Sequence, residues 1–224
     1  MAVHLLTGAG SGIGAALAAR LGARGDDLVL LARSAARAEE LLSAHPGARV
    51  VVADLADPGS LQGVALPARL DSLVHAAGVV ELGSVADLGT AAWTEQVAVN
   101  LVSPAVLTRE ALPALRAARG TVVMLNSGAG HFARPHWSAY AATKHGLKAL
   151  ADALRAEEAE HGVRVTSIYP GRVATPMQER VHAQEATDYD ASAWIRPETV
   201  VEAILTALDL PGDATMPELV LKPR

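Results

Sequence analysis

Seven short apolar runs lie along the chain, and stretches with helical periodicity separate most of them. The runs are apolar throughout and do not alternate with polar residues, a pattern typical of strands buried on both faces. Strands that alternate with helices predict right-handed crossovers and a doubly wound α/β sheet of seven mostly parallel strands, with helices on both faces. The predicted strands are Val3–Thr7, Leu28–Ala32, Arg49–Ala53, Ser72–Ala76, Gly120–Asn126, Val163–Tyr169 and Glu218–Leu221.

The periodic stretches between these runs predict the helices. Pro104 and Pro113 should kink or divide the longest of them, because proline removes a backbone donor and clashes with the preceding turn. Pro170–Arg196 shows little periodicity and is expected to be a loop. The predicted helices are one through Ile13, Leu17 and Leu21, then Ala35–Ala44, a weak one after Leu55, Thr90–Ala118, Ser138–His161 and a last one opening at Pro197.

Composition narrows the class of protein. The 224 residues and 23.1 kDa fit one domain spanning 1–224, and no repeat or linker divides it. Half the residues are hydrophobic, yet no apolar run approaches the roughly 20 residues of a membrane span, and the N-terminus does not resemble a signal peptide. Without cysteine there is no disulfide, thiol nucleophile or zinc-thiolate site, and we expect no metal. A net charge of -5 argues against nucleic-acid binding. A soluble, cytoplasmic protein is expected.

A glycine cluster sits where the first predicted strand meets the first helix. Glycines there permit a tight turn and close approach of the backbone to a pyrophosphate, with the helix N-terminus facing the anion. The spacing fits two patterns, one through Gly10, Gly12 and Ala15 and one through Gly8, Gly12 and Gly14. Turn geometry alone is the alternative, but this position favours dinucleotide binding. The residues concerned are Thr7, Gly8, Gly10, Ser11, Gly12, Ile13 and Gly14.

The residues after the second strand indicate which dinucleotide would bind. An NAD site usually has an acidic residue there, whereas an arginine suits the 2′-phosphate of NADP. Here Arg33 and Ser34 follow the strand, with Arg37 one helical turn on. A guanidinium forks onto phosphate and a serine hydroxyl can add a donor. The alternative is a solvated arginine at a helix start. We therefore expect NADP(H), with NAD(H) possible.

Tyr140 and Lys144 lie four residues apart in a predicted helix and therefore share one face. An ammonium near a phenol stabilises the phenolate, so we expect Lys144 to lower the pKa of Tyr140 and make it a general acid or base. Ser127, thirteen residues earlier, could place a hydroxyl on the same substrate. The alternative is an ordinary helix with a half-buried tyrosine and a surface lysine.

In this order and on these elements, the motifs resemble the classical short-chain dehydrogenase/reductase family, and the match covers nearly the whole chain. T-G-x-x-x-G-x-G falls at Thr7 to Gly14 and Y-x-x-x-K at Tyr140 to Lys144. The resemblance implies a Rossmann-type fold, with Asn100 as a catalytic residue beside Ser127. It also implies cofactor contacts from Asp54, Leu55, Ala76, Ala77, Gly78, Pro170, Gly171, Val173 and Thr175. One departure is His75, which replaces the family's asparagine before Ala-Ala-Gly and concerns local packing more than catalysis.

The resemblance also implies a mechanism. Tyr140 would protonate the carbonyl oxygen, Ser127 would orient it, and Lys144 would hold the ribose. Asn100 would hold a relay water through its backbone or its side chain. The chain contains only two asparagines, Asn100 and Asn126, and only three lysines against sixteen arginines, so a lysine at 144 is less easily explained by chance.

Two segments are expected to shape the substrate pocket. The stretch 128–137 is bulky for a chain so poor in aromatics, and 173–195 would form a mobile, solvent-facing lid with Tyr189 and Trp194 as further apolar candidates. An acid/base role for His131 or His136 stays open against placement in the wall or on the surface, and His45, His161 and His182 are expected at the surface. The predicted substrate-pocket residues are Ser127, His131, Phe132, Trp137 and Met177.

The leading hypothesis is an NADP-dependent oxidoreductase acting on a small or medium alcohol/carbonyl pair. A non-catalytic, NADP-sensing protein is the alternative. An extended-class epimerase or dehydratase would need a larger C-terminal domain and a different glycine turn. The resemblance implies a homodimer or homotetramer through the helices carrying Asn100 and Tyr140. An apolar stripe is compatible with that interface or equally with the core, and its members are Leu101, Leu107, Leu147 and Leu154.

Overall fold

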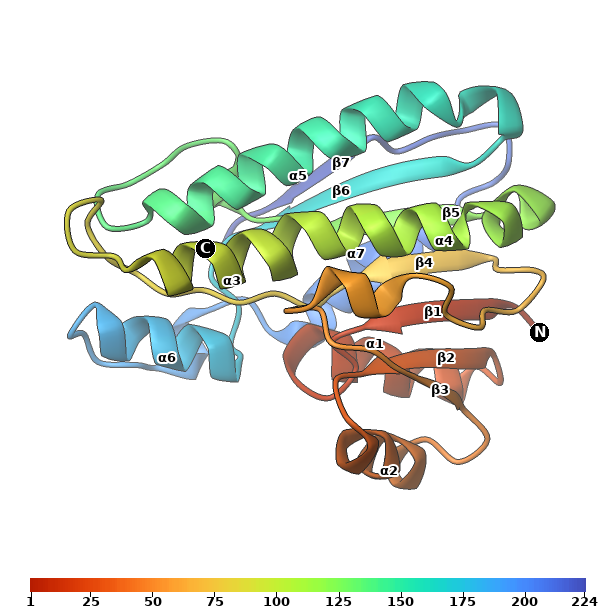
Figure 1. Ribbon diagram of the computed structural model, residues 1–224, viewed down its shortest axis with the longest axis horizontal. Helices are drawn as coiled ribbons and strands as arrows, with labels where there is room; N and C mark the ends of the chain where they lie inside the picture. The colour runs from red at the N-terminus through yellow and green to blue at the C-terminus, as the bar shows by residue number, and fades with distance from the viewer.

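The computed structural model describes all residues, 1–224, and centres on one seven-stranded sheet (Figure 1). The strand order is β3-β2-β1-β4-β5-β6-β7, and every neighbouring pair is parallel. The predicted doubly wound sheet is confirmed, with each strand within a residue of its predicted bounds. The strands are β1 (Val3–Thr7), β2 (Asp27–Ala32), β3 (Arg49–Val52), β4 (Ser72–His75), β5 (Thr121–Leu125), β6 (Arg164–Pro170) and β7 (Glu218–Leu221).

Helices cover both faces of the sheet and bury two separate cores. On one face α1, α2 and α7 enclose a cluster that includes Leu17, Leu30 and Ile204; on the other, α4 and α5 enclose one that includes Leu73, Leu107 and Leu147. Strands buried on both sides explain why their sequences are apolar without alternation. The helices are α1 (Gly12–Ala23), α2 (Ala35–Ala44), α3 (Thr90–Val97), α4 (Ser103–Ala118), α5 (Ser138–Glu157), α6 (Pro176–Gln184) and α7 (Pro197–Leu208).

The long predicted helix Thr90–Ala118 is divided, but not by its prolines. A single turn of π-helix, η2 (Ala98–Val102), separates α3 from α4. Pro104 lies in the first turn of α4, where its missing N–H is not needed, and α4 continues through Pro113. Such π-turns often mark functional positions. This one carries Asn100.

Two other predictions about helices were wrong. The weak helix expected after Leu55 is only a 3₁₀ turn, η1 (Pro58–Leu61). The stretch Pro170–Arg196, expected to be a loop, contains α6. Thr175 caps α6 by accepting a hydrogen bond from the Gln178 N–H at 3.3 Å, and Pro176 opens its first turn. These two start signals outweigh the weak apolar periodicity of the helix.

Three of the four leucines of the apolar stripe belong to the core. Leu107, Leu147 and Leu154 are buried, and Leu101 packs against Gly146, where an added Cβ would lie 2.8 Å from a Leu101 methyl carbon. Only Leu101 of this stripe is partly exposed. No helix is both long enough and apolar enough to span a membrane.

The carboxyl ends of β1 and β4 meet at the centre of the sheet, where the chain changes direction after winding from β1 to β3. The Thr7 hydroxyl joins the two ends by accepting hydrogen bonds from the N–H groups of Ala76 and Ala77, both at 3.1 Å. Ligands of open α/β sheets bind in the crevice at such a switch point.

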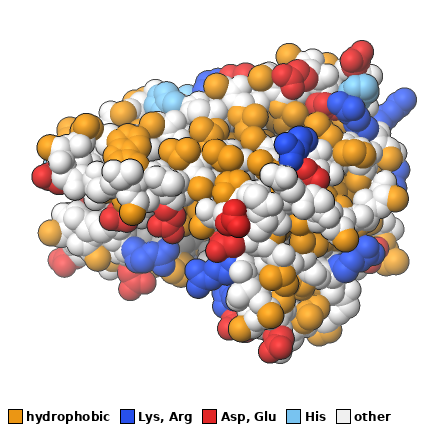
Figure 2. All heavy atoms as spheres, in the orientation of Figure 1, with side chains coloured by type: hydrophobic (Ala, Val, Ile, Leu, Met, Phe, Trp, Pro, Cys, Tyr) orange, Lys and Arg blue, Asp and Glu red, His pale blue; other side chains and the backbone are white.

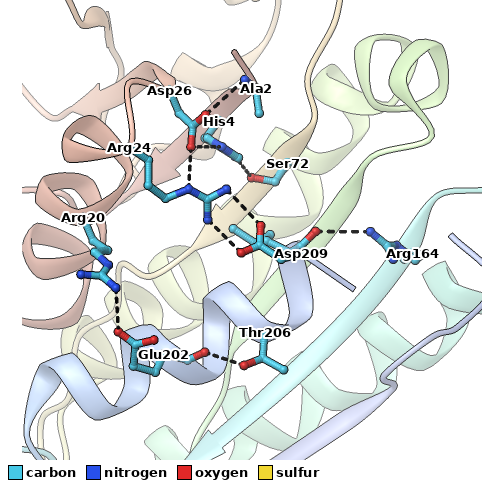
Figure 3. A network of polar contacts seen from close by, with 11 residues as sticks. Ala2, His4, Arg20, Arg24, Asp26, Ser72, Arg164, Glu202, Thr206 and Asp209 are labelled. Atoms are coloured by element: carbon cyan, nitrogen blue, oxygen red, sulfur yellow. Dashed lines mark hydrogen bonds and ion pairs between the residues drawn. The ribbon is translucent and has the colours of Figure 1, made fainter. Parts of the chain in front are cut away.

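At the other end of the strands, the amino-terminal edge of the sheet, polar side chains form a network of hydrogen bonds and ion pairs (Figure 3). Arg24 makes a two-pronged contact with Asp209 at 2.9 and 3.0 Å and reaches Asp26 at 3.1 Å. His4, buried at the start of β1, shares a 2.7 Å hydrogen bond with the Ser72 hydroxyl and lies 3.5 Å from Asp26. This network joins α1, α7, β1 and β4.

Candidate active site

The glycine turn between β1 and α1 is shaped for close backbone contact. A Cβ on Gly8 would lie 2.8 Å from the Ala77 nitrogen, and one on Gly14 would lie 2.2 Å from the Gly8 carbonyl oxygen. Gly12 has a left-handed backbone with φ of 53°, and a Cβ there would press on Thr175 at 3.1 Å. The backbone N–H groups of Gly12 and Ile13 have no hydrogen-bond partner in the protein, so the N-terminus of α1 keeps free donors for an anion.

The two arginines after β2 are in different states. Arg37 donates to the Gly10 carbonyl oxygen at 2.9 Å and pairs with Glu40, so it is part of the turn's own support. Arg33 is exposed, lines the same cavity and makes no hydrogen bond or ion pair. Ser34 caps α2 by accepting from the Arg37 N–H at 3.3 Å. Arg33 is therefore the free cation at this end of the cavity.

Asp54 and Leu55 line the same cavity as the glycine turn and follow the end of β3. The Asp54 carboxylate accepts from the Ala56 N–H at 2.9 Å, and the Leu55 carbonyl accepts from the Ser103 hydroxyl at 2.7 Å. These contacts fix the loop while leaving both residues in the cavity lining.

Tyr140, Lys144 and Ser127 come together as the sequence predicts. Tyr140 and Lys144 are buried on one face of α5, with the Lys144 Nζ 5.6 Å from the centre of the Tyr140 ring. Ser127 directly follows β5, and all three line the cavity. Trp137 packs edge-on to Tyr140 with ring centres 5.7 Å apart and holds the ring in place.

The expectation that Lys144 lowers the pKa of Tyr140 is wrong for the protein's own groups. Burial raises the pKa of Tyr140 to about 12, and the Ser127 hydroxyl opposes this only in part. Burial also lowers the pKa of Lys144 to about 8. The Lys144 ammonium donates to the Leu125 carbonyl oxygen at 2.9 Å, not to the phenol. Desolvation therefore outweighs the attraction between ammonium and phenolate here.

Asn100 is buried in the π-turn and does not line the cavity. Its side-chain amide donates to the Val79 carbonyl at 2.8 Å and to the Thr143 hydroxyl at 3.2 Å, while its oxygen accepts from the Val79 N–H at 2.9 Å. Both amide hydrogens are used, so the side chain joins the strand-four loop to α5. A water held by this side chain would therefore have to donate to its oxygen, which keeps a second lone pair.

Asn126 is a positioning residue to which the sequence prediction gave no role. Its amide donates to the Lys144 carbonyl oxygen at 3.1 Å, and its oxygen accepts from the Ser127 N–H at 2.9 Å. One side chain thus ties the Ser127 loop to the turn of α5 that carries Lys144. Gly130 makes room for it, because a Cβ there would lie 2.5 Å from the Asn126 oxygen. The rarity of asparagine in the chain was the available signal.

His75 fills the place of the family's asparagine as a buried, neutral side chain. Its Nε2 lies 2.9 Å from the Thr108 hydroxyl, which ties β4 to α4. Burial lowers the pKa of His75 to about 3, with a smaller contribution from the Lys144 charge. The replacement keeps a hydrogen bond inside the fold and does not line the cavity.

The lid, residues 173–195, was expected to be a mobile, solvent-facing loop, but several contacts hold it against the rest of the protein. Its two ends pair, with the Ala174 N–H donating to the Ile195 carbonyl at 2.8 Å, and the Gln184 side chain accepts from the Leu82 N–H at 2.7 Å. His182, expected at the surface, is buried, where its ring packs against Tyr189 and Trp194 at 5.3 Å. Met177 and Trp194 line the cavity and Tyr189 does not.

The loop 128–137 forms another wall. His131 is exposed, stacks on Tyr169 with ring centres 4.1 Å apart, and lines the cavity, as do Phe132 and Trp137. His136 does not line it and has a left-handed backbone with φ of 66°. This placement favours a wall role for His131 over a second acid or base.

One cavity of about 1070 Å³ connects these parts, from the end of β2 to the lid. Of the predicted site residues only Thr7, Gly14, Ser34 and Asn100 do not line it, and the contacts above show that each supports a neighbour that does. The size, the glycine turn and the free N–H groups of α1 fit a bound dinucleotide.

Comparison with known proteins agrees with this geometry. A family model described as short chain dehydrogenase matches residues 2–186. Dehydrogenase/reductase SDR family member 7B of Bos taurus is 35% identical over 228 residues, covering 92% of this chain and 70% of that protein. The granaticin polyketide synthase putative ketoacyl reductase 1 of Streptomyces violaceoruber is 35% identical over 202 residues, covering 85% of this chain and 74% of that protein.

A solved structure is similar over nearly the whole chain. The alcohol dehydrogenase of the archaeon Thermococcus sibiricus, complexed with 5-hydroxy-NADP, superposes with a TM-score of 0.81 at 26% identity, covering 99% of this chain and 96% of that one. The chain therefore belongs to the short-chain dehydrogenase/reductase family, whose members are oxidoreductases that interconvert CH–OH and C=O groups with a nicotinamide cofactor.

Proposed function

We propose that this protein is an NADP(H)-dependent reductase or dehydrogenase in which Ser127, Tyr140 and Lys144, supported by Asn100, interconvert a carbonyl and an alcohol. The observation that carries the proposal is the convergence of these three side chains on one cavity that also contains the glycine turn and an unpaired Arg33. A non-catalytic sensor would need the cofactor contacts of this cavity, Lys144 included, but not a buried Tyr140 with the Ser127 hydroxyl on the same cavity.

The bound nicotinamide would supply the hydride in reduction and accept it in oxidation. Arg33 would bind the 2′-phosphate, the free N–H groups of Gly12 and Ile13 the pyrophosphate, and Lys144 the ribose hydroxyls. Asp54 and Leu55 would border the adenine. Pro170, Gly171, Val173 and Thr175 would border the nicotinamide amide, since they line the cavity where the lid begins.

Tyr140 would give its proton to the carbonyl oxygen, and Ser127 would donate a hydrogen bond that orients that oxygen. A pKa of about 12 keeps the phenol protonated at neutral pH, which is the form that reduction needs. Lys144, cationic below a pKa of about 8, would stabilise the phenolate left behind. Proton resupply would run through a water held by the Asn100 backbone or by its side-chain oxygen, because both amide hydrogens are already used.

NADPH oxidation measured against a panel of ketones and aldehydes tests the activity. Turnover with at least one carbonyl supports an enzyme, whereas tight NADPH binding without turnover across the panel would favour the sensor.

The cofactor preference has its own test. Replacing Arg33 by Ala should raise the KM for NADPH about tenfold or more and leave the KM for NADH nearly unchanged, because a charge-assisted contact to the 2′-phosphate is lost. Arg49→Ala, an exposed arginine at the start of β3 without partners, is the matched control. Equal effects on both cofactors would contradict the NADP assignment.

A further inference from the structure

The charge of the cavity differs from the charge of the chain. The protein carries a net charge of -5, yet seven of the residues that line the cavity are Lys or Arg and only two, Asp54 and Glu95, are acidic. A cavity of one sign raises the local concentration of oppositely charged ligands.

Several of these cations are already engaged. Arg37 pairs with Glu40, and Arg172 pairs with Glu185 at 2.8 Å and lies over the Trp194 ring. Lys144 is buried beside Tyr140. Arg33 would bind the cofactor's 2′-phosphate and is therefore not available to a substrate.

Three cations remain, and all of them belong to the substrate side of the cavity. Arg134, Arg180 and Lys222 are exposed, line the cavity and make no side-chain hydrogen bond or ion pair. They come from three separate segments: Arg134 from the loop between Ser127 and Tyr140, Arg180 from α6 of the lid, and Lys222 from the residues after β7.

The sheet brings these segments to one place. Leu221 pairs with Pro170, and the Gly171 N–H donates to the Leu221 carbonyl at 2.8 Å, so Lys222 follows directly beside the start of the lid. Figure 1 places the C-terminus at the same end of the sheet as α6 and the beginning of α5. On the face shown in Figure 2, Lys and Arg side chains lie beside the hollow next to α6. Three unpaired cations from different elements thus line the cavity at the end of the sheet where the lid begins.

We infer that the substrate carries an anionic group, a carboxylate or a phosphate, apart from its reacting carbonyl, and that Arg134, Arg180 and Lys222 bind it. This inference rests on the proposed function, because it names the substrate class of that same site. A guanidinium matches either anion with two parallel hydrogen bonds. Glu95, on α3, has no partner either and is the one acidic side chain on this side of the cavity.

The test compares matched charged and neutral carbonyl compounds with NADPH. One arm uses acetoacetate, levulinate and 5-oxohexanoate with their amides, and a second uses dihydroxyacetone phosphate with dihydroxyacetone, so the arms distinguish carboxylate from phosphate. We expect kcat/KM at least about tenfold higher for the anion in one arm, falling with added salt. Arg134→Gln and Arg180→Gln should each reduce that preference several-fold, Lys222→Gln less, and the control Arg49→Gln not at all.

The outcomes separate this inference from the proposed function. Turnover of neutral ketones without preference for either anion, unchanged in the arginine variants, would overturn the anionic substrate and leave the reductase standing. If no carbonyl is turned over, calorimetric titration with the same compounds in the presence of NADP⁺ measures whether they bind. Binding of an anion that is lost in Arg134→Gln and Arg180→Gln, without turnover of any carbonyl, would keep the anion site and contradict the proposed function. No binding and no turnover would overturn both.

Discussion

A cavity lies at each end of the strands, and the charged side chains that line the two cavities differ in whether they are paired. At the amino-terminal edge, a cavity of about 670 Å³ between α1 and α7 is lined by Arg20, Arg24, Glu202 and Asp209, which pair with one another. At the carboxyl edge, the larger cavity keeps Arg33 and three further cations unpaired and buries Lys144 away from any carboxylate.

This difference separates groups that hold the fold together from groups kept for a ligand. Removing one member of a buried, paired set of charges leaves its partner uncompensated, whereas a lysine buried without a counter-ion costs stability and persists where function needs it. The shift of the Lys144 pKa from 10.5 to about 8 corresponds to a cost on the order of 3 kcal/mol. The first two predictions below test the two ends of the sheet against each other, and the third tests a buried histidine that lines neither cavity.

Lys144→Met should have the largest effect. We expect kcat/KM to fall by about 10²- to 10⁴-fold, while the free energy of unfolding at pH 7 rises by about 1–3 kcal/mol because a desolvated charge is removed. The native pKa lies below the unfolded one, so the unfolded chain binds more protons between pH 8 and 10.5 and the wild type gains stability across that window. The advantage of the variant should therefore shrink toward pH 10. Urea unfolding at pH 7 and pH 9.5 measures this, and a less stable variant at pH 7 would contradict it.

Asp26→Asn should produce the opposite result. Asp26 is nearly buried between Arg24 and His4 and also accepts from the Ala2 N–H at 3.3 Å, so losing its charge should destabilise the fold by about 1–3 kcal/mol. Turnover of the folded variant should stay within about twofold, because the network lies at the far edge of the sheet. Asp213→Asn, exposed and without partners, is the control. A large loss of kcat in folded Asp26→Asn would contradict the claim that this network supports the fold but not turnover.

His75→Asn should have the smallest effect and acts through pH. Below pH 6.5 the unfolded histidine binds a proton that folded His75 does not bind until about pH 3, so the stability of the wild type falls as the pH drops through that window, by at most about 1.4 kcal/mol per pH unit. Asparagine cannot titrate, so the variant should gain on the wild type between pH 7 and pH 5. Urea unfolding at both values checks this. A constant difference would show that His75 is not held neutral.

Patterns within one segment predicted the fold well, because a strand buried on both faces is a continuous apolar run that can be recognised without knowing its neighbours. The seven strands followed from such runs, and the glycine turn followed from the glycine cluster after the first run. In α6 only Met177 and Val181 give an apolar repeat, so periodicity missed a helix that Thr175 and Pro176 begin.

Contacts between distant segments could not be read in this way. His182 is buried by Tyr189 and Trp194, and Asn126 acts through Lys144, eighteen residues later. The prediction of a lowered pKa for Tyr140 was wrong for the same reason. The spacing shows that Lys144 is near, but not how deeply both groups are buried. The sequence also could not show that Arg33 lacks a partner, because that depends on every segment around it.

The central claim is that Tyr140 handles the proton at the carboxyl edge of the sheet, and Tyr140→Phe tests it most directly. Single-turnover oxidation of NADPH with a carbonyl that the wild type reduces should slow by about 10²-fold or more, because the phenylalanine keeps the packing against Trp137 and loses only the hydroxyl. The Kd for NADPH should stay within about twofold of the wild type. An unchanged rate of turnover at an unchanged Kd would contradict the account.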